Sequence, residues 1–115
     1  MSVEIWHNPR CSKSRTALEL LRVTGVEPSV VLYLESPPSV ERLDEVLGLL
    51  GVGPRDLMRK GEAPYQELGL SDPSLGREAL VRALAENPIL IERPIVIANG
   101  RAVVARPPER ALDVL

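Results

Sequence analysis

Cys11, the single cysteine of the sequence, is the residue best suited to covalent chemistry. It lies where a short β-prone segment, residues 3–7, gives way to a predicted helix that runs from Cys11 or Ser12 to Thr24. Backbone N–H groups at a helix start are unpaired and carry partial positive charge, so they stabilise a thiolate. The neighbouring side chains are polar or proline, whereas a structural cysteine would lie among leucines and valines. The pattern therefore predicts a nucleophilic Cys11.

Residues close to Cys11 in the sequence could support its ionisation. His7, Arg10 and Arg15 would add positive charge, and His7 is either a base or the polar end of a strand. Ser14 lies three residues after Cys11 on the same helical face, so its hydroxyl is expected to donate a hydrogen bond to the sulfur. No second cysteine is available to resolve an adduct, so an oxidised Cys11 requires an external thiol such as glutathione or a thiol protein. His7 and Cys11 alone do not make a metal site, and neither a metal nor a bound cofactor is expected.

The elements that must position Cys11 begin with a βαβ unit. After the helix, Gly25 is a natural stop, and the apolar run Ser29 to Leu34 predicts a strand buried on both faces. Strands joined through a helix in this way are expected to be parallel. The segment from about 37 to 88 is predicted to be a helical insertion, in which Ser39 is the N-cap and Gly51 the end of the first helix.

The last part of the chain predicts a β-hairpin and a closing helix. Two apolar segments, residues 95–98 and 102–105, flank Asn99-Gly100, a dipeptide favoured in type I′ turns. A short helix is expected from Glu109 to Val114. The order βαβ, inserted helices and ββα predicts an α/β fold with a mixed, thioredoxin-like sheet in one domain, residues 1–115.

Several motifs together resemble the glutaredoxin-coupled arsenate reductases of the ArsC type, within the thioredoxin-like superfamily. The first is the loop His7-Asn8-Pro9-Arg10-Cys11-Ser12-Lys13-Ser14-Arg15, and the others follow in order along the chain: Tyr33-Leu34-Glu35, Leu57-Met58-Arg59-Lys60, Pro64-Tyr65, Glu67-Leu68-Gly69-Leu70, Asn87-Pro88-Ile89-Leu90-Ile91, Arg93-Pro94-Ile95-Val96 and Arg106-Pro107. The resemblance covers nearly the whole chain. Ser12 and Lys13 depart from the Gly-Thr pair of the best-known members, and Lys13 could change the oxyanion selectivity.

The resemblance implies arsenate reduction, a function within the oxidoreductases. It implies that the catalytic cysteine is Cys11 and that Arg59, Arg93 and Arg106 hold the oxyanion, with His7, Asn8, Ser14 and Arg15 in the supporting loop. It also implies a cis peptide bond before Pro94, which would direct Arg93 toward the sulfur. The implied partners are glutathione as co-substrate and glutaredoxin, which reduces the mixed disulfide left on Cys11.

The net charge and the lengths of the apolar segments limit the functional classes to which the protein could belong. The formal net charge of −2 gives no general attraction to nucleic acid, and no segment approaches the length of a membrane span. No signal peptide is visible, so a cytoplasmic protein is expected, with a monomer as the default. Two alternatives stay open: a glutathione-dependent thiol oxidoreductase with another substrate, and a regulatory binding module similar to the Spx proteins, which bind RNA polymerase. Spx-type members generally carry a CxxC switch, which Ser14 interrupts here.

Overall fold

The computed structural model describes residues 2–115, which form two compact units. The first unit combines residues 2–36 with Arg93–Leu115, and the second is Pro37–Glu92. The second unit corresponds to the predicted helical insertion and extends four residues further than expected, to Glu92. That the whole chain is one domain stays a prediction.

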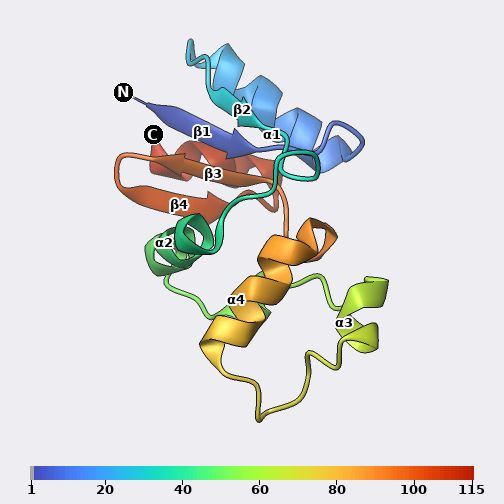
Figure 1. The fold of residues 1–115 in the computed structure, drawn as a ribbon. Helices are drawn as coiled ribbons and strands as arrows, with labels where there is room; N and C mark the ends of the chain where they lie inside the picture. Colours follow the sequence, from blue (N-terminus) through green and yellow to red (C-terminus); the bar gives the residue numbers. More distant parts are fainter. Residues whose placement is uncertain (1) are drawn as a thin grey trace. The chain divides into compact units, whose positions relative to one another are not determined.

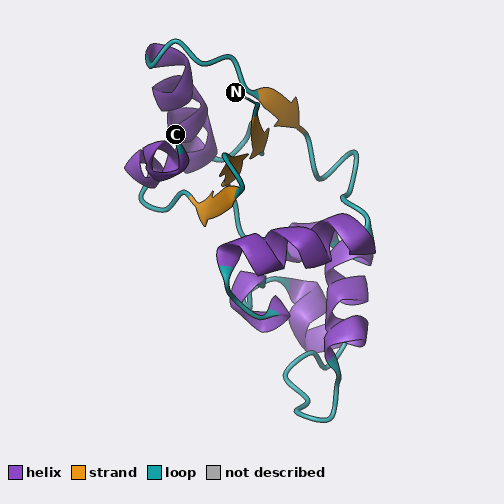
Figure 2. Ribbon diagram, turned by 90° about the vertical axis from the view of Figure 1, so that its left-hand side faces the viewer, coloured by secondary structure: helices purple, strands orange, loops and turns teal. Residues whose placement is uncertain are grey.

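The first unit is a four-stranded sheet with helices on one face. Its elements are β1 (Val3–Trp6), α1 (Ser12–Val23), β2 (Ser29–Val31), β3 (Ile95–Ala98), β4 (Arg101–Val104) and the 3₁₀ helix η3 (Pro108–Val114). The strand order is β2-β1-β3-β4, with β1 parallel to β2 and antiparallel to β3 (Figure 1). Figure 2 shows α1 and η3 on the same side of the strands. The predicted βαβ and ββα parts are therefore confirmed.

Alternation of side chains along the strands builds the core of this unit. Every second residue of a strand faces the helices, because successive side chains point to opposite faces of a sheet. The core on the helical side is made from aliphatic residues of the strands, of α1, of η3 and of the position just after β4: Val3, Ile5, Ala17, Leu18, Leu21, Val96, Ala98, Val103, Ala105, Ala111 and Val114. The hairpin turn has positive φ angles at Asn99 (56°) and Gly100 (70°), as the Asn-Gly signal predicts.

β2 differs from the prediction in both length and burial. It ends at Val31 instead of Leu34, and it lies at the edge of the sheet. Val30, Leu32 and Leu34 are between 36% and 41% exposed, so the expectation of a strand buried on both faces is wrong. An apolar run of this length does not distinguish an edge strand from a central one.

The second unit consists of short helices around their own apolar side chains. They are α2 (Val40–Leu50), η1 (Pro54–Leu57), α3 (Ala63–Glu67), α4 (Arg77–Glu86) and η2 (Pro88–Leu90). Ser39 caps α2 by accepting a hydrogen bond from the Arg42 N–H at 3.1 Å, and Gly51 ends the helix with φ 70°. Both cap predictions are confirmed.

Candidate active site

The register of the sheet brings three loops of the first unit to the same end of the strands. Trp6 lies opposite Ile95, which in turn lies opposite Val104. The residues after β1, those before β3 and those after β4 therefore lie at the same end of the sheet. The Ala105 N–H donates to the Pro94 carbonyl at 2.9 Å, which joins the second and third of these loops.

Cys11 is the N-cap residue of α1, in extended conformation and partly buried. The Cys11 N–H donates to the Asn8 carbonyl at 3.0 Å, and the Cys11 carbonyl accepts from the Arg15 N–H at 3.0 Å. The Asn8 side chain turns the loop, because its Oδ1 accepts from the Arg10 N–H at 3.0 Å. The sulfur is thus placed at the first turn of the helix, as the sequence predicts.

The surroundings of Cys11 favour the thiolate. Partial burial acts against ionisation and would raise the pKa of the thiol. The Ser14 backbone N–H, the Arg93 guanidinium and the Lys13 backbone N–H all act in the opposite direction, and together they hold the pKa of Cys11 below its ordinary value of 9.0. The stabilisation therefore comes from the start of α1 and from an arginine just before β3.

The Ser14 hydroxyl lies elsewhere than predicted. Ser14 is fully buried, and its Oγ is 2.6 Å from His7 Nδ1 and accepts from the Asn8 N–H at 3.0 Å. The residue reaches the sulfur through its backbone N–H instead. Arg15 Nη1 donates to the Pro9 carbonyl at 2.8 Å and so braces the loop.

His7 is buried, and its environment disfavours the imidazolium. Burial, followed by the charges of Arg22 and Arg15, lowers the pKa of His7 below 6.5. At neutral pH the imidazole is therefore neutral, and it does not supply the positive charge that the sequence suggested.

This lowered pKa predicts a pH-dependent loss of stability. Below pH 6.5 the unfolded chain takes up a proton at His7 that the folded chain does not, so the free energy of unfolding falls as the pH decreases toward the folded-state pKa. The slope from this one group is at most about 1.4 kcal/mol per pH unit. Urea unfolding of wild type and His7→Asn at about pH 7 and about pH 5.5 measures it. We expect the variant to lose less stability on acidification, and equal losses in both proteins would contradict the assignment.

Arg93 and Arg106 lie together in the loops at this end of the sheet. Arg106 Nη1 donates to the Arg93 carbonyl at 3.4 Å, and both residues are partly buried. Arg93 Nε is the one buried side-chain nitrogen or oxygen atom without a hydrogen-bond partner among the residues that the structure describes. A buried donor of this kind is costly unless a ligand accepts its hydrogen bond. The peptide bond before Pro94 is cis, as the resemblance implies, and so is that between Arg106 and Pro107.

Arg59 belongs to the second unit, where its surroundings can be described separately. Its backbone N–H donates to the Leu90 carbonyl at 2.7 Å, and its Nη1 lies 3.1 Å from a carboxylate oxygen of Glu62. The side chain is 27% exposed. Its role in holding an oxyanion stays a prediction.

Comparison with known proteins identifies the family. The sequence model of the ArsC family matches residues 6–114, which is nearly the whole chain. The chain belongs to the ArsC family. The resemblance of its motifs to the ArsC family is thereby confirmed.

Relatives agree with this assignment. The ArsC chain is 49% identical to an arsenate reductase of Neisseria meningitidis over 98% of its own length and 97% of the relative. It is 54% identical to YfgD of Escherichia coli K12, whose name states no activity, over 98% and 96%. The structure of an arsenate reductase from Vibrio cholerae superposes with a TM-score of 0.96 at 52% identity, covering 100% of this chain and 98% of that one. The thioredoxin-like α/β fold is confirmed.

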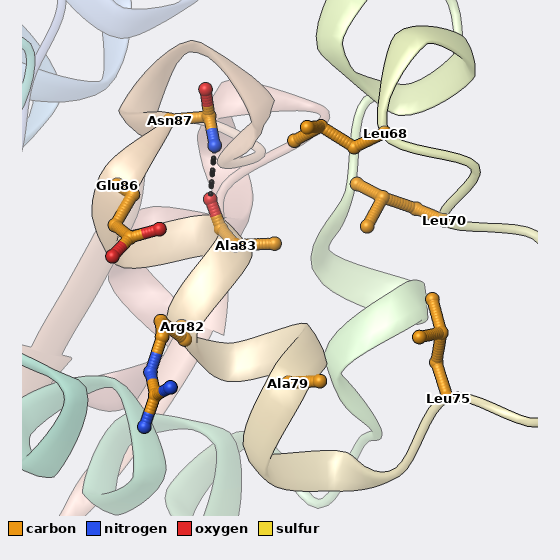
Figure 3. A pocket seen from close by; sticks show the side chains of 8 residues that line it. All are labelled: Leu68, Leu70, Leu75, Ala79, Arg82, Ala83, Glu86 and Asn87. Carbon is orange, nitrogen blue, oxygen red and sulfur yellow. Dashed lines mark hydrogen bonds between the residues drawn. The ribbon is translucent and has the colours of Figure 1, made fainter.

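The second unit of this ArsC chain holds a hollow of about 260 Å³ beside α4 (Figure 3). Its lining is mainly leucine and alanine: Leu68, Leu70, Leu75, Ala79, Arg82, Ala83, Glu86 and Asn87. It contains no thiol, and Arg82 is paired with Glu78 at 3.3 Å.

Within residues 2–115 there is no group of three or more His, Cys, Asp or Glu placed to bind a metal, and none of the described helices is long and apolar enough to cross a membrane.

Proposed function

We propose that this protein reduces arsenate to arsenite, with the Cys11 thiolate as the nucleophile. The observation that carries the proposal is the juxtaposition of a stabilised thiolate with the Arg93 guanidinium, whose Nε is buried and unpaired. Two backbone N–H groups hold the sulfur as an anion, and the free N–H of Arg93 offers a hydrogen bond to a second anion. Membership of the ArsC family makes arsenate the best candidate for that second anion.

The proposed reaction begins with displacement at arsenic. The Cys11 thiolate attacks As(V), an As–O bond breaks and oxygen leaves as hydroxide or water, which gives a Cys11 thioarsenate. A glutathione thiolate then attacks the Cys11 sulfur and breaks the S–As bond, so that arsenic takes the electron pair and leaves as As(III). The two sulfurs are together oxidised by two electrons to a mixed disulfide. Glutaredoxin attacks the glutathione sulfur and returns Cys11 to the thiolate.

Arginine side chains would prepare the substrate for this attack. A thiolate and a doubly charged tetrahedral oxyanion repel each other, so the charge on the oxyanion must be neutralised before they meet. Guanidinium groups donate paired N–H bonds to two oxygens with defined geometry. We assign this role to Arg93 and Arg106, and the family motifs imply the same role for Arg59. Further parts of the proposal are the glutathione and glutaredoxin coupling, the absence of a bound cofactor, the cytoplasmic location and the monomeric state.

The proposal is tested by following NADPH oxidation with glutathione, glutaredoxin and glutathione reductase present. We expect oxidation that depends on arsenate and that stops when either glutaredoxin or this protein is omitted. Phosphate in place of arsenate is the matched control, because it has the same shape and charge but is not reduced. Turnover of a glutathione mixed disulfide without any response to arsenate would instead support the alternative of a thiol oxidoreductase with another substrate.

A further inference from the structure

Ser14 is one of two buried polar side chains among the residues that the structure describes, and His7 is the other. The exposed fraction is 0% for Ser14 and 6% for His7. A hydroxyl enclosed in the protein must find hydrogen-bond partners. Both of its partners, His7 and Asn8, belong to the segment that leaves β1.

The His7–Ser14 hydrogen bond ties the two residues in either tautomer of the imidazole. The Asn8 N–H occupies one lone pair of the Ser14 Oγ at 3.0 Å. Burial and nearby arginines keep the imidazole neutral, so over this 2.6 Å contact either the Ser14 hydroxyl donates to an unprotonated His7 Nδ1, or a protonated Nδ1 donates to the second lone pair of Oγ. When the hydroxyl donates, the His7 proton lies on Nε2. In this arrangement the hydroxyl proton is not available to the sulfur.

The same residue that is anchored by its hydroxyl presents its backbone to Cys11. The Ser14 backbone N–H stabilises the Cys11 thiolate, and so does the N–H of the preceding residue, Lys13. These amides belong to the first turn of α1, while the hydroxyl of Ser14 bonds to the end of β1. Residues 8–11 therefore form a short loop that is closed by the Ser14 side chain and by the hydrogen bond from Cys11 N–H to Asn8 O.

We propose that Ser14 is a positioning residue for the Cys11 nucleophile: its buried hydroxyl ties the first turn of α1 to the end of β1 and so holds the amides of Lys13 and Ser14 against the sulfur. Without this tie the helix start and the loop are free to move apart, and the amides point less directly at the thiolate. The inference relies on Cys11 being the nucleophile of the proposed function. It does not depend on which oxyanion or disulfide that nucleophile attacks.

The test is the pH dependence of Cys11 alkylation by iodoacetamide, which needs no arsenate. We expect Ser14→Ala to raise the apparent thiol pKa by about one unit, so that alkylation at neutral pH slows up to about tenfold. Ser14→Thr, which keeps the hydroxyl, should restore most of the reactivity. Thr16→Ala is the matched control, because Thr16 is exposed on the same helix and its hydroxyl donates only to the Ser12 carbonyl at 3.0 Å. A folded Ser14→Ala that titrates like the wild type would overturn the proposal.

A measurement on the wild-type chain keeps the proposal testable if Ser14→Ala does not fold. Nitrogen NMR of the His7 ring should show a neutral imidazole whose Nδ1 is hydrogen-bonded. The amide signals of Lys13 and Ser14 should shift with the same midpoint as Cys11 alkylation. A His7 Nδ1 that shows no hydrogen bond would refute the anchoring role. Arsenate-dependent turnover plays no part in either measurement, so failure of the proposed function would be recognised separately.

Discussion

Replacing Cys11 with serine is expected to abolish arsenate-dependent NADPH oxidation. Serine keeps the size and the polar character of the side chain, but its hydroxyl does not ionise at the pH where the amides of Lys13 and Ser14 and the Arg93 guanidinium stabilise a thiolate. The variant therefore has no anionic nucleophile for As(V). We expect activity at the level of the assay without protein, a loss of at least about a thousandfold.

Two controls separate loss of chemistry from loss of structure. Circular dichroism should give the same spectrum for Cys11→Ser as for the wild type, because Cys11 is the N-cap residue of α1 and serine is favoured at that position. Wild-type protein alkylated at Cys11 should lose activity in proportion to the fraction alkylated, as measured by intact mass. Full turnover by Cys11→Ser would refute both enzymatic interpretations of this chain.

The sequence predicts the parts of the fold whose signals are local. The Asn99-Gly100 turn, the Ser39 cap and the stop at Gly51 depend on neighbouring residues alone, and the structure confirms them. β2 was predicted too long and too buried, because its place at the sheet edge depends on strands far along the chain. The β-propensity of a segment indicates that it can form a strand, but it does not indicate how many other strands will pair with it.

The candidate site shows the same division. The position of Cys11 at a helix start follows from the local pattern, whereas the nearness of Arg93 requires the pairing of Trp6 with Ile95. No spacing within the sequence predicts that pairing, and only the family resemblance selected Arg93 and Arg106. The contact of the Ser14 hydroxyl with His7 was missed because helical geometry favoured Cys11 as its partner. One signal in the sequence could have indicated this contact: Ser14 lies on the helix face that also carries Ala17, Leu18 and Leu21, and all four residues are buried. A serine on a buried face needs a hydrogen-bond partner inside the protein.

Removing the Arg93 guanidinium is expected to have the second largest effect, because this one group acts on both the nucleophile and the oxyanion. Arg93→Ala removes a positive charge and a hydrogen bond that lower the pKa of Cys11, so the alkylation profile should move to higher pH. It also removes the buried Nε that has no protein partner. We expect kcat/KM for arsenate to fall by about a hundredfold to a thousandfold, the range for loss of one donor to a reacting oxyanion.

Arg93→Lys separates the two roles of Arg93. Lysine keeps the positive charge, so part of the lowered thiol pKa should return, but it lacks the planar fork that binds two oxygens of an oxyanion. Alkylation of Cys11 should therefore recover more than kcat/KM for arsenate does. Arg101→Ala is the matched control, because Arg101 is exposed on β4 and its Nη2 donates to the Leu115 carbonyl at 3.5 Å. Equal recovery of alkylation and of arsenate turnover in Arg93→Lys would mean that charge alone matters, and the paired N–H contact would then have no part in binding the oxyanion.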